Sequence, residues 1–250
     1  MGKVYLVGAG PGAADLLTVR AARLLAKADI VFHDALVEPE VLDLAPGAQK
    51  VAVGKRCGAH STSQRFINKR LVDAAARHAT VVRLKGGDPM LFGRAQEEID
   101  ALAAAGVQVE VVPGVTAALA AAADLRLSLT RRGVARSVAM VTPRVGEGEA
   151  PNAWAQAAAA ADTAVIYMGS GDAERVVAAL VEQGMPLSRP VVMVQNASRP
   201  DVVQTAGTLG ELPALAARRG AGPALIVIGE IGRALALAAS PAPAFAATGT

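Results

Sequence analysis

A glycine loop near the N-terminus contains the first residues that could do chemistry. Gly8-Ala-Gly-Pro-Gly-Ala13 follows a short apolar run and fits the G-x-G-x-x-G/A pattern of dinucleotide-binding sites, with Asp34 about 20 residues beyond it. Two residues oppose a nicotinamide cofactor, because Pro11 lacks a backbone N–H for a pyrophosphate and Asp15 would repel one. A cofactor with a cationic sulfonium group has no phosphate, so neither Pro11 nor Asp15 argues against it. The loop is also compatible with an ordinary strand-to-helix turn, and an NAD(P)-dependent oxidoreductase stays as a distant alternative.

A second glycine pair, Gly86 and Gly87, precedes Asp88 and Pro89. Neither glycine has a Cβ, so the backbone there could lie close to a ligand. The Asp88 carboxylate could accept hydrogen bonds from a ribose hydroxyl or an amino group. The segment therefore predicts a ligand-binding loop, with a plain turn as the alternative.

The charged residues favour an anionic small molecule over nucleic acid. The net charge of +3 is small and the basic residues are scattered, so no nucleic-acid partner is expected. Arginine binds carboxylates bidentately and stays charged, although a solvated surface role is open for each one. The candidates for holding an anionic ligand are Arg56, Arg94, Arg131, Arg132 and Arg136.

The histidines, the cysteine and the hydropathy pattern argue against a metalloprotein, a secreted protein and a membrane-spanning protein. His33 and His60 have no companions at metal-ligand spacing, so no metal is expected. Cys57 is the single cysteine and cannot form an internal disulfide, and nothing at the start resembles a signal peptide, which together favour a cytoplasmic protein. The apolar window 223–239 is interrupted by charged residues, so no membrane span is expected.

Strands and helices alternate along the first half of the chain, and the strands end in polar or glycine residues. This alternation is typical of an α/β fold with a parallel sheet, in which ligands bind beyond the carboxyl ends of the strands. Apolar runs predict strands at 4–7, 30–32, 50–53, 80–84 and 107–112, and helical spacing predicts helices at 16–25, 64–77 and 95–105.

A second series of elements begins after Pro113 with an alanine-rich helix that runs to Ala123. A chain of 250 residues suits two domains. We therefore expect two α/β domains, 1–113 and 114–239, and a disordered tail at 240–250 that is rich in proline and alanine. In the second domain the predicted strands are 137–141, 163–168, 191–194 and 224–228, and the predicted helix is 173–183.

Taken together, the motifs at the strand ends resemble those of the tetrapyrrole methylase family, in particular the members that methylate uroporphyrinogen III. The match covers nearly the whole chain, and the order and spacing of the motifs make it specific. The matching motifs are Val7-Gly-Ala-Gly-Pro-Gly12, Phe32-His-Asp-Ala-Leu-Val37, Val53-Gly-Lys-Arg56, His60-Ser-Thr-Ser-Gln64 with Ile67-Asn68, Arg83-Leu-Lys-Gly-Gly-Asp-Pro89, Phe92-Gly-Arg94 with Glu97-Glu98, Val112-Pro-Gly-Val-Thr-Ala117, Tyr167-Met-Gly169 and Gln195-Asn-Ala-Ser198.

The resemblance implies a homodimer in which each chain has two α/β domains. It implies that S-adenosylmethionine binds in the cleft between the domains and leaves as S-adenosylhomocysteine. The residues that it assigns to the cofactor are Pro11, Gly86, Gly87, Asp88, Leu91, Thr116, Ala117, Met168 and Ala197.

The reaction that the resemblance implies is C-methylation of uroporphyrinogen III at carbons 2 and 7, through precorrin-1 to precorrin-2. It makes Asp34 a candidate proton acceptor and Lys55 a candidate proton donor, with a strand-end cap and a surface charge as the respective alternatives. Arg94, with Glu97 one helical turn away, is a candidate for orienting the substrate or assisting proton loss. Because arginine is a poor base at neutral pH, we expect its role to be mainly electrostatic.

Three arginines, Arg94, Arg131 and Arg132, are expected to hold the carboxylates of the substrate. The chain departs from the common family pattern at Arg131 and Arg144, where histidines are usual, and at His33, where tyrosine is usual. These departures leave open a methyltransferase that acts on a later precorrin or cobalt-precorrin. A non-catalytic tetrapyrrole-binding protein is a further alternative. The sequence does not distinguish sirohaem, cobalamin and haem d1 synthesis as the use of the product.

Overall fold

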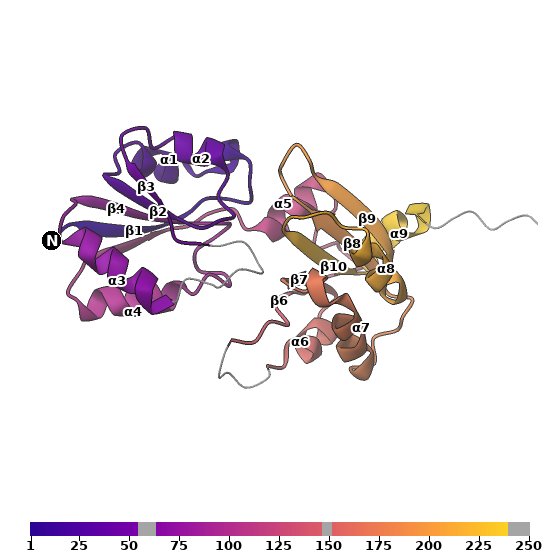
Figure 1. The fold of residues 1–250 in the computed structure, drawn as a ribbon. Helices are drawn as coiled ribbons and strands as arrows, with labels where there is room; N and C mark the ends of the chain where they lie inside the picture. The colour runs from indigo at the N-terminus through magenta and orange to yellow at the C-terminus, as the bar shows by residue number, and fades with distance from the viewer. Residues whose placement is uncertain (55–63, 147–151, 240–250) are drawn as a thin grey trace, which may run out of the picture. The chain divides into compact units, whose positions relative to one another are not determined.

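The computed structural model describes residues 1–54, 64–146 and 152–239 (Figure 1). The division between two compact units lies inside helix α5 (Ala117–Asp124), whereas the sequence predicted a boundary at Pro113. The expected tail at 240–250 lies outside the described residues. The first unit contains Met1–Ala120 and Ala197–Pro200, and the second contains Ala121–Asn196 and Asp201–Thr250.

Five parallel strands form the sheet of the first unit, in the order β3-β2-β4-β1-β5. The predicted parallel sheet is thus confirmed. Because the strands run the same way, their carboxyl ends and the polar segments that follow lie at one edge of the sheet. The strands are β1 (Lys3–Gly8), β2 (Ile30–His33), β3 (Gln49–Ala52), β4 (Thr80–Lys85) and β5 (Val109–Val112).

Helices cover both faces of this sheet (Figure 1). On one face lie α1 (Val19–Leu25) and α2 (Pro39–Asp43), and on the other lie α3 (Gln64–Ala75) and α4 (Ala95–Ala104). Apolar strand residues are therefore buried on both sides. For this reason the strands are recognisable in the sequence as continuous apolar runs rather than as alternating ones.

Helix α1 begins later than predicted. A 3-10 turn, η1 (Ala14–Leu16), comes first and contains Asp15. The α-helix starts at Val19 because the hydroxyl of Thr18 accepts a hydrogen bond from the backbone N–H of Ala21 at 3.1 Å and caps the helix there. The apolar periodicity runs through both elements, so it did not reveal the break.

The second unit has a mixed sheet in the order β6-β7-β10-β8-β9. β6 and β7 pair in parallel, whereas β7 with β10, β10 with β8 and β8 with β9 are antiparallel. β9 was not predicted, because its sequence is largely polar or small and it pairs with β8 alone at the edge of the sheet. The strands are β6 (Val138–Val141), β7 (Thr163–Tyr167), β8 (Pro190–Gln195), β9 (Val203–Thr208) and β10 (Ala224–Gly229).

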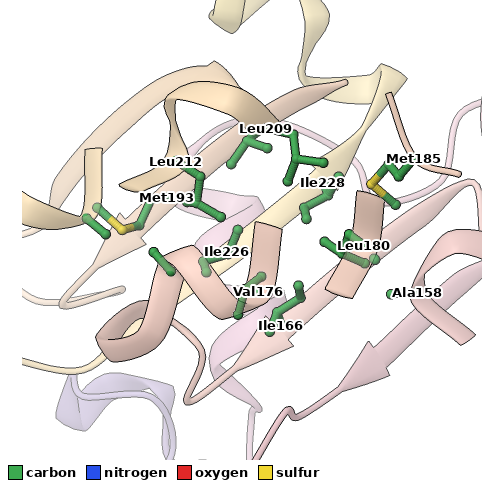
Figure 2. Close-up of a cluster of buried hydrophobic side chains, with 14 of the residues drawn as sticks. Ala158, Ile166, Val176, Leu180, Met185, Met193, Leu209, Leu212, Ile226 and Ile228 are labelled. Atoms are coloured by element: carbon green, nitrogen blue, oxygen red, sulfur yellow. The ribbon is translucent and has the colours of Figure 1, made fainter. Parts of the chain in front are cut away.

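The apolar core of the second unit lies between this sheet and three of its helices. Figure 2 shows Ile166 and Ile226 of the sheet close to Val176 and Leu180 of α7, with Leu212 of α8 beside them. The predicted helix at 173–183 is α7 and the predicted alanine-rich helix is α5, whereas α6, α8 and α9 were not predicted. None of the described helices is both long and apolar enough to span a membrane. The helices are α6 (Trp154–Ala160), α7 (Ala173–Glu182), α8 (Leu212–Ala217) and α9 (Arg233–Ala239), with 3-10 turns η2 (Ser170–Asp172), η3 (Leu209–Glu211) and η4 (Glu230–Gly232).

Candidate active site

The loops after β1, β4 and β5 meet at the carboxyl edge of the first sheet, and glycines allow this close approach. Gly87 N–H donates to the carbonyl of Gly10 at 2.7 Å, and Gly10 N–H donates to the carbonyl of Gly87 at 3.2 Å. A Cβ on Gly8 would lie 2.6 Å from the Cα of Gly114, and a Cβ on Gly114 would overlap the Gly87 carbonyl. The three loops are therefore packed backbone against backbone.

Asp88 joins two of these loops. Its Oδ2 accepts a hydrogen bond from the backbone N–H of Gly114 at 2.9 Å, and its Oδ1 accepts one from the N–H of Met90 at 2.8 Å. A carboxylate oxygen has two lone pairs, so each oxygen keeps capacity for a further donor. Asp88 can thus hold the loops together and accept from a ligand, whereas the sequence predicted the second role alone.

Other residues predicted for the cofactor surround this meeting point. The Cα of Thr116 is 3.9 Å, and the backbone nitrogen of Ala117 is 4.0 Å, from the position that a Cβ on Gly87 would take. The N–H of Leu91 donates to the carbonyl of Asp88 at 3.3 Å. The structure therefore brings these predicted residues together within the first unit.

Gly86 and Pro11 lie beside the same loops. A Cβ on Gly86 would be 3.3 Å from the Cβ of Leu36, in the segment that follows β2. Pro11 comes directly after Gly10, which has a left-handed φ of 73° and is bonded to the loop after β4. Both predicted residues thus belong to the same edge of the first unit.

The segment Ala197–Pro200 contacts the first glycine loop. The hydroxyl oxygen of Ser198 accepts a hydrogen bond from the N–H of Ala13 at 3.1 Å, and Arg199 pairs with Glu38 at 2.7 Å. Ala197, predicted for the cofactor, is buried at the start of this segment. The sequence carried no signal for these contacts, since 185 positions separate Ala13 from Ser198.

Left-handed backbone conformations gather at the predicted motifs. Six non-glycine residues among those described have a positive φ, and Arg126 is the one that lies outside the motifs. Such conformations cost about 1–3 kcal/mol each and are frequent at ligand-binding sites. Met168, at the end of β7 in the second unit, combines a φ of 56° with an exposed side chain. The residues inside the motifs are Phe92, Arg94, Met168, Asn196 and Ser198.

Asp34, the predicted proton acceptor, is the outer end of a buried charge network formed with Arg83, Glu98 and Lys85. Its Oδ1 pairs with Nη2 of Arg83 at 2.6 Å, and Nε of Arg83 donates to Oε1 of Glu98 at 3.0 Å. Nζ of Lys85 lies 3.1 Å from both carboxylate oxygens of Glu98. The side chain of Asp34 is 29% exposed, whereas those of the other three are at most 4% exposed. Asp34 is therefore the member of the network that a substrate can reach.

Burial and charge oppose each other on the two cations of this network. Burial lowers the pKa of Arg83, but the attraction of Asp34 and Glu98 outweighs it, so the pKa is raised overall. The pKa of Lys85 is lowered, first by burial and then by the neighbouring charge of Arg83, and the attraction of Glu98 does not restore it. Arg83 is thus the firmly charged partner of Asp34.

Arg94 and Glu97 form the ion pair that the sequence predicted. Nε of Arg94 lies 2.6 Å from Oε1 of Glu97, and Nη2 lies 2.7 Å from Oε2, so the contact is bidentate. The hydrogen bond from Arg94 lowers the pKa of Glu97. Arg94 precedes α4 with a φ of 55°, and its side chain is 59% exposed. The guanidinium is therefore oriented by Glu97 and accessible to a ligand.

Arg131 and Arg132 lie on an exposed turn of the second unit, which is closed by backbone hydrogen bonds between Arg131 and Ala135. Lys55, like Arg56 and His60, lies outside the described residues. Within residues 1–54, 64–146 and 152–239, no group of three or more histidine, cysteine, aspartate or glutamate side chains could hold a metal ion.

Sequence reasoning did not assign roles to Arg83, Lys85 and Glu98, although a signal was present. Arg83 and Lys85 stand in the otherwise apolar run of β4, a strand whose residues are buried on both faces. Buried cations require buried anions, so their presence in such a strand predicts a carboxylate packed against it. Which carboxylate that would be depends on the fold.

Comparison with known proteins shows the family of the chain. A family model described as Tetrapyrrole (Corrin/Porphyrin) Methylases matches residues 3–213. The chain is a tetrapyrrole methylase. The family that the motifs predicted is thus confirmed.

This tetrapyrrole methylase is 44% identical over 233 residues to the uroporphyrinogen-III C-methyltransferase of Pseudomonas aeruginosa, with 93% of this chain and 95% of that protein covered. It is 43% identical over 235 residues to the siroheme synthase of Azotobacter vinelandii, with 93% of this chain and 51% of that protein covered. The methylase therefore spans about half the length of the siroheme synthases that it matches.

A solved structure is similar over the same length. The uroporphyrin-III C-methyl transferase of Thermus thermophilus, complexed with S-adenyl homocysteine, matches with a TM-score of 0.82 and 42% identity, covering 93% of this methylase and 100% of that chain. The predicted fold class, two α/β domains of the tetrapyrrole methylase type, is confirmed by this match.

Proposed function

We propose that this methylase transfers methyl groups from S-adenosylmethionine to uroporphyrinogen III and forms precorrin-2 by way of precorrin-1. The observation that carries the proposal is the 44% identity with the Pseudomonas aeruginosa uroporphyrinogen-III C-methyltransferase, since that match extends over 93% of this chain and 95% of that one. The chemistry of the described residues supports it in three ways: at the cofactor loops, at the proton acceptor and at the exposed arginines.

The carboxyl edge of the first sheet suits a sulfonium cofactor better than a dinucleotide. Pro11 has no N–H, and the N–H groups of Gly10 and Gly87 are bonded to each other's carbonyls, so neither faces a pyrophosphate. Asp88 keeps acceptor capacity for a ribose hydroxyl or an amino group. The residues that would hold the cofactor are Pro11, Gly86, Gly87, Asp88, Leu91, Thr116, Ala117, Met168 and Ala197.

S-adenosylmethionine supplies an electrophilic methyl group, which a pyrrole carbon of the substrate takes as the C–S bond breaks. The protein aligns the two reactants and excludes water from the reacting atoms. A proton must then leave a bridging carbon of the macrocycle to restore a neutral conjugated system, so a base is needed. We assign this base to Asp34, whose carboxylate is the exposed end of the buried charge network. For Lys55, the resemblance to the family alone supports the role of proton donor.

The substrate carries eight carboxylates on a flexible macrocycle, and exposed arginines are the side chains suited to bind them. Arg94 is the best defined of these, because Glu97 orients its guanidinium at the start of α4. Arg131 and Arg132 are exposed on one turn of the second unit and are proposed to bind further carboxylates. Electrostatic attraction, rather than proton transfer, is the role proposed for each of them.

We also propose that the methylase acts as a cytoplasmic homodimer. The single cysteine suits a reducing compartment, and the resemblance to the family supports the dimer. Light scattering on the purified protein tests the assembly. A mass close to that of one chain, 25.3 kDa, would refute the dimer.

Anaerobic incubation with uroporphyrinogen III and labelled S-adenosylmethionine tests the proposed reaction. A product that carries two labelled methyl groups is expected, and absence of any methylated product would overturn the proposal. A later precorrin or cobalt-precorrin is the second candidate substrate, favoured by the departures at His33, Arg131 and Arg144. Turnover of such a precorrin but not of uroporphyrinogen III would select it, and binding of NAD in place of S-adenosylmethionine would select the oxidoreductase.

A further inference from the structure

We propose that Arg83 is a positioning residue that orients the carboxylate of Asp34 for proton acceptance, with Glu98 holding Arg83 in turn. The inference rests on the proposed function, because it concerns the residue to which proton acceptance is assigned. It concerns side chains that do not themselves reach the substrate.

Three nitrogens of the Arg83 guanidinium are held at once. Nη2 donates to Oδ1 of Asp34 at 2.6 Å, Nε donates to Oε1 of Glu98 at 3.0 Å, and Nη1 donates to the carbonyl of Leu84 at 3.1 Å. The guanidinium is planar and rigid, so these three contacts fix its position relative to β4. Asp34 follows β2, the neighbour of β4, and its carboxylate is thereby anchored to the next strand of the sheet.

Glu98 holds the Arg83 guanidinium through Nε, whereas Asp34 binds it through Nη2. Glu98 is fully buried, and its Oε1 accepts from Arg83, from Lys85 at 3.1 Å and from Nε2 of Gln64 at 3.2 Å. Gln64 belongs to α3 and Glu98 to α4, so both helices that cover this face of the sheet hold the position of Arg83. The network therefore has little freedom to reorient, and Asp34 is its one partly exposed group.

The network contains two cations and two anions and is neutral as a whole. Burying such charges is costly, and apolar side chains of similar volume often give equal or greater stability. Stability alone therefore gives little reason for the buried Arg83 and Glu98 behind Asp34. Presentation of one oriented carboxylate at the carboxyl edge of the sheet does give a reason, since that edge is where the cofactor loops meet.

The test compares two substitutions in the 250-residue chain, Arg83→Gln and Lys85→Gln. Both remove a buried cation that pairs with Glu98, but Arg83 also pairs with Asp34, whereas Nζ of Lys85 bonds to the two carboxylate oxygens of Glu98. We expect Arg83→Gln to lower kcat about tenfold or more, with the KM of both substrates and the Kd of S-adenosylhomocysteine changed less than about threefold. Lys85→Gln should lower thermal stability as well but reduce kcat by less than about threefold.

A second arm uses the Asp34→Asn variant under single-turnover conditions. If Arg83 acts through Asp34, adding Arg83→Gln to Asp34→Asn should slow the reaction by less than about threefold, because the group that it orients is already lost. An equal slowing in both backgrounds would mean that Arg83 has a merely structural role and would overturn the inference.

Arg83→Lys covers the case in which Arg83→Gln does not fold. A lysine keeps the charge but cannot hold Asp34 and Glu98 in the same fork, so turnover should fall while S-adenosylhomocysteine binding persists. Wild-type turnover in Arg83→Lys or Arg83→Gln would overturn the inference and leave the proposed function standing. Failure of the wild-type protein to form any methylated product would instead overturn the proposed function.

Discussion

Gly114→Ala adds a single methyl group, but it should disrupt the packing of the three loops that follow β1, β4 and β5. The added methyl group would lie 2.8 Å from the Cα of Gly8 and would overlap the carbonyl oxygen of Gly87. Carbon atoms in contact prefer a separation of about 3.5–4.0 Å, so the ends of β1 and β5 would have to separate by about 1 Å. Both obstacles are backbone atoms, which cannot rotate away as a flexible side chain would.

The expected loss follows from this overlap. Overpacking of a well-packed region costs about 1–3 kcal/mol, and we take about 2 kcal/mol for Gly114→Ala. In a chain of this size each kcal/mol lowers Tm by about 2–4 °C, which predicts a fall of about 4–8 °C. A displacement of about 1 Å in groups that position a ligand should also weaken S-adenosylhomocysteine binding about tenfold or more.

Gly47→Ala is the matched control, since a Cβ there would meet no atom within 4 Å. Its effect on stability should stay within about 0.5 kcal/mol of zero. Differential scanning calorimetry and titration calorimetry with S-adenosylhomocysteine measure both quantities on the two variants. If Gly114→Ala has the Tm and the affinity of Gly47→Ala, the loops are not packed as rigidly as the structure indicates, and the reasoning fails.

Three further predictions concern single side chains. Asp88→Asn replaces one carboxylate oxygen with an NH2 group, which cannot accept the hydrogen bond from the N–H of Met90 or of Gly114. The substitution should therefore lower the free energy of unfolding by about 1–3 kcal/mol in chemical denaturation. It should also abolish S-adenosylhomocysteine binding in calorimetry, and unchanged affinity would contradict the prediction. Arg94→Ala should lose turnover yet still bind S-adenosylhomocysteine, and lost binding would refute that separation of roles. Hydrogen bonds from the Arg136 N–H and from the hydroxyl and N–H of Ser137 lower the pKa of Asp162 below its ordinary value of 3.8, so the stability they add is present above that pH and is lost as pH falls through the lowered pKa. The Tm difference between wild type and Asp162→Asn should therefore shrink between about pH 6 and about pH 3, and a constant difference would contradict the assignment.

The candidate site was partly predictable because several of its residues have local signatures. Glycine at Gly86 and Gly87 and the acid at Asp88 mark a loop where backbone approaches closely, and Arg94 with Glu97 is a pair at helical spacing. These features depend on neighbours a few positions away. The structure adds that Asp88 binds the loop after β5, which no local pattern contains.

The sequence by itself determined the parallel sheet of the first unit and the polar ends of its strands, because helical segments between apolar runs leave few other arrangements. Tertiary structure alone decided which distant residues became partners. Strand order places β2 beside β4, with Phe32 opposite Arg83, and so brings Arg83 to Asp34, 49 positions away. It also decided the antiparallel pairing of β8 and β9, where the polar sequence of β9 gives no apolar signal. The physical reason is the same in each case: these contacts depend on long-range packing, whereas periodicity and turn residues report on the nearest few positions of the chain.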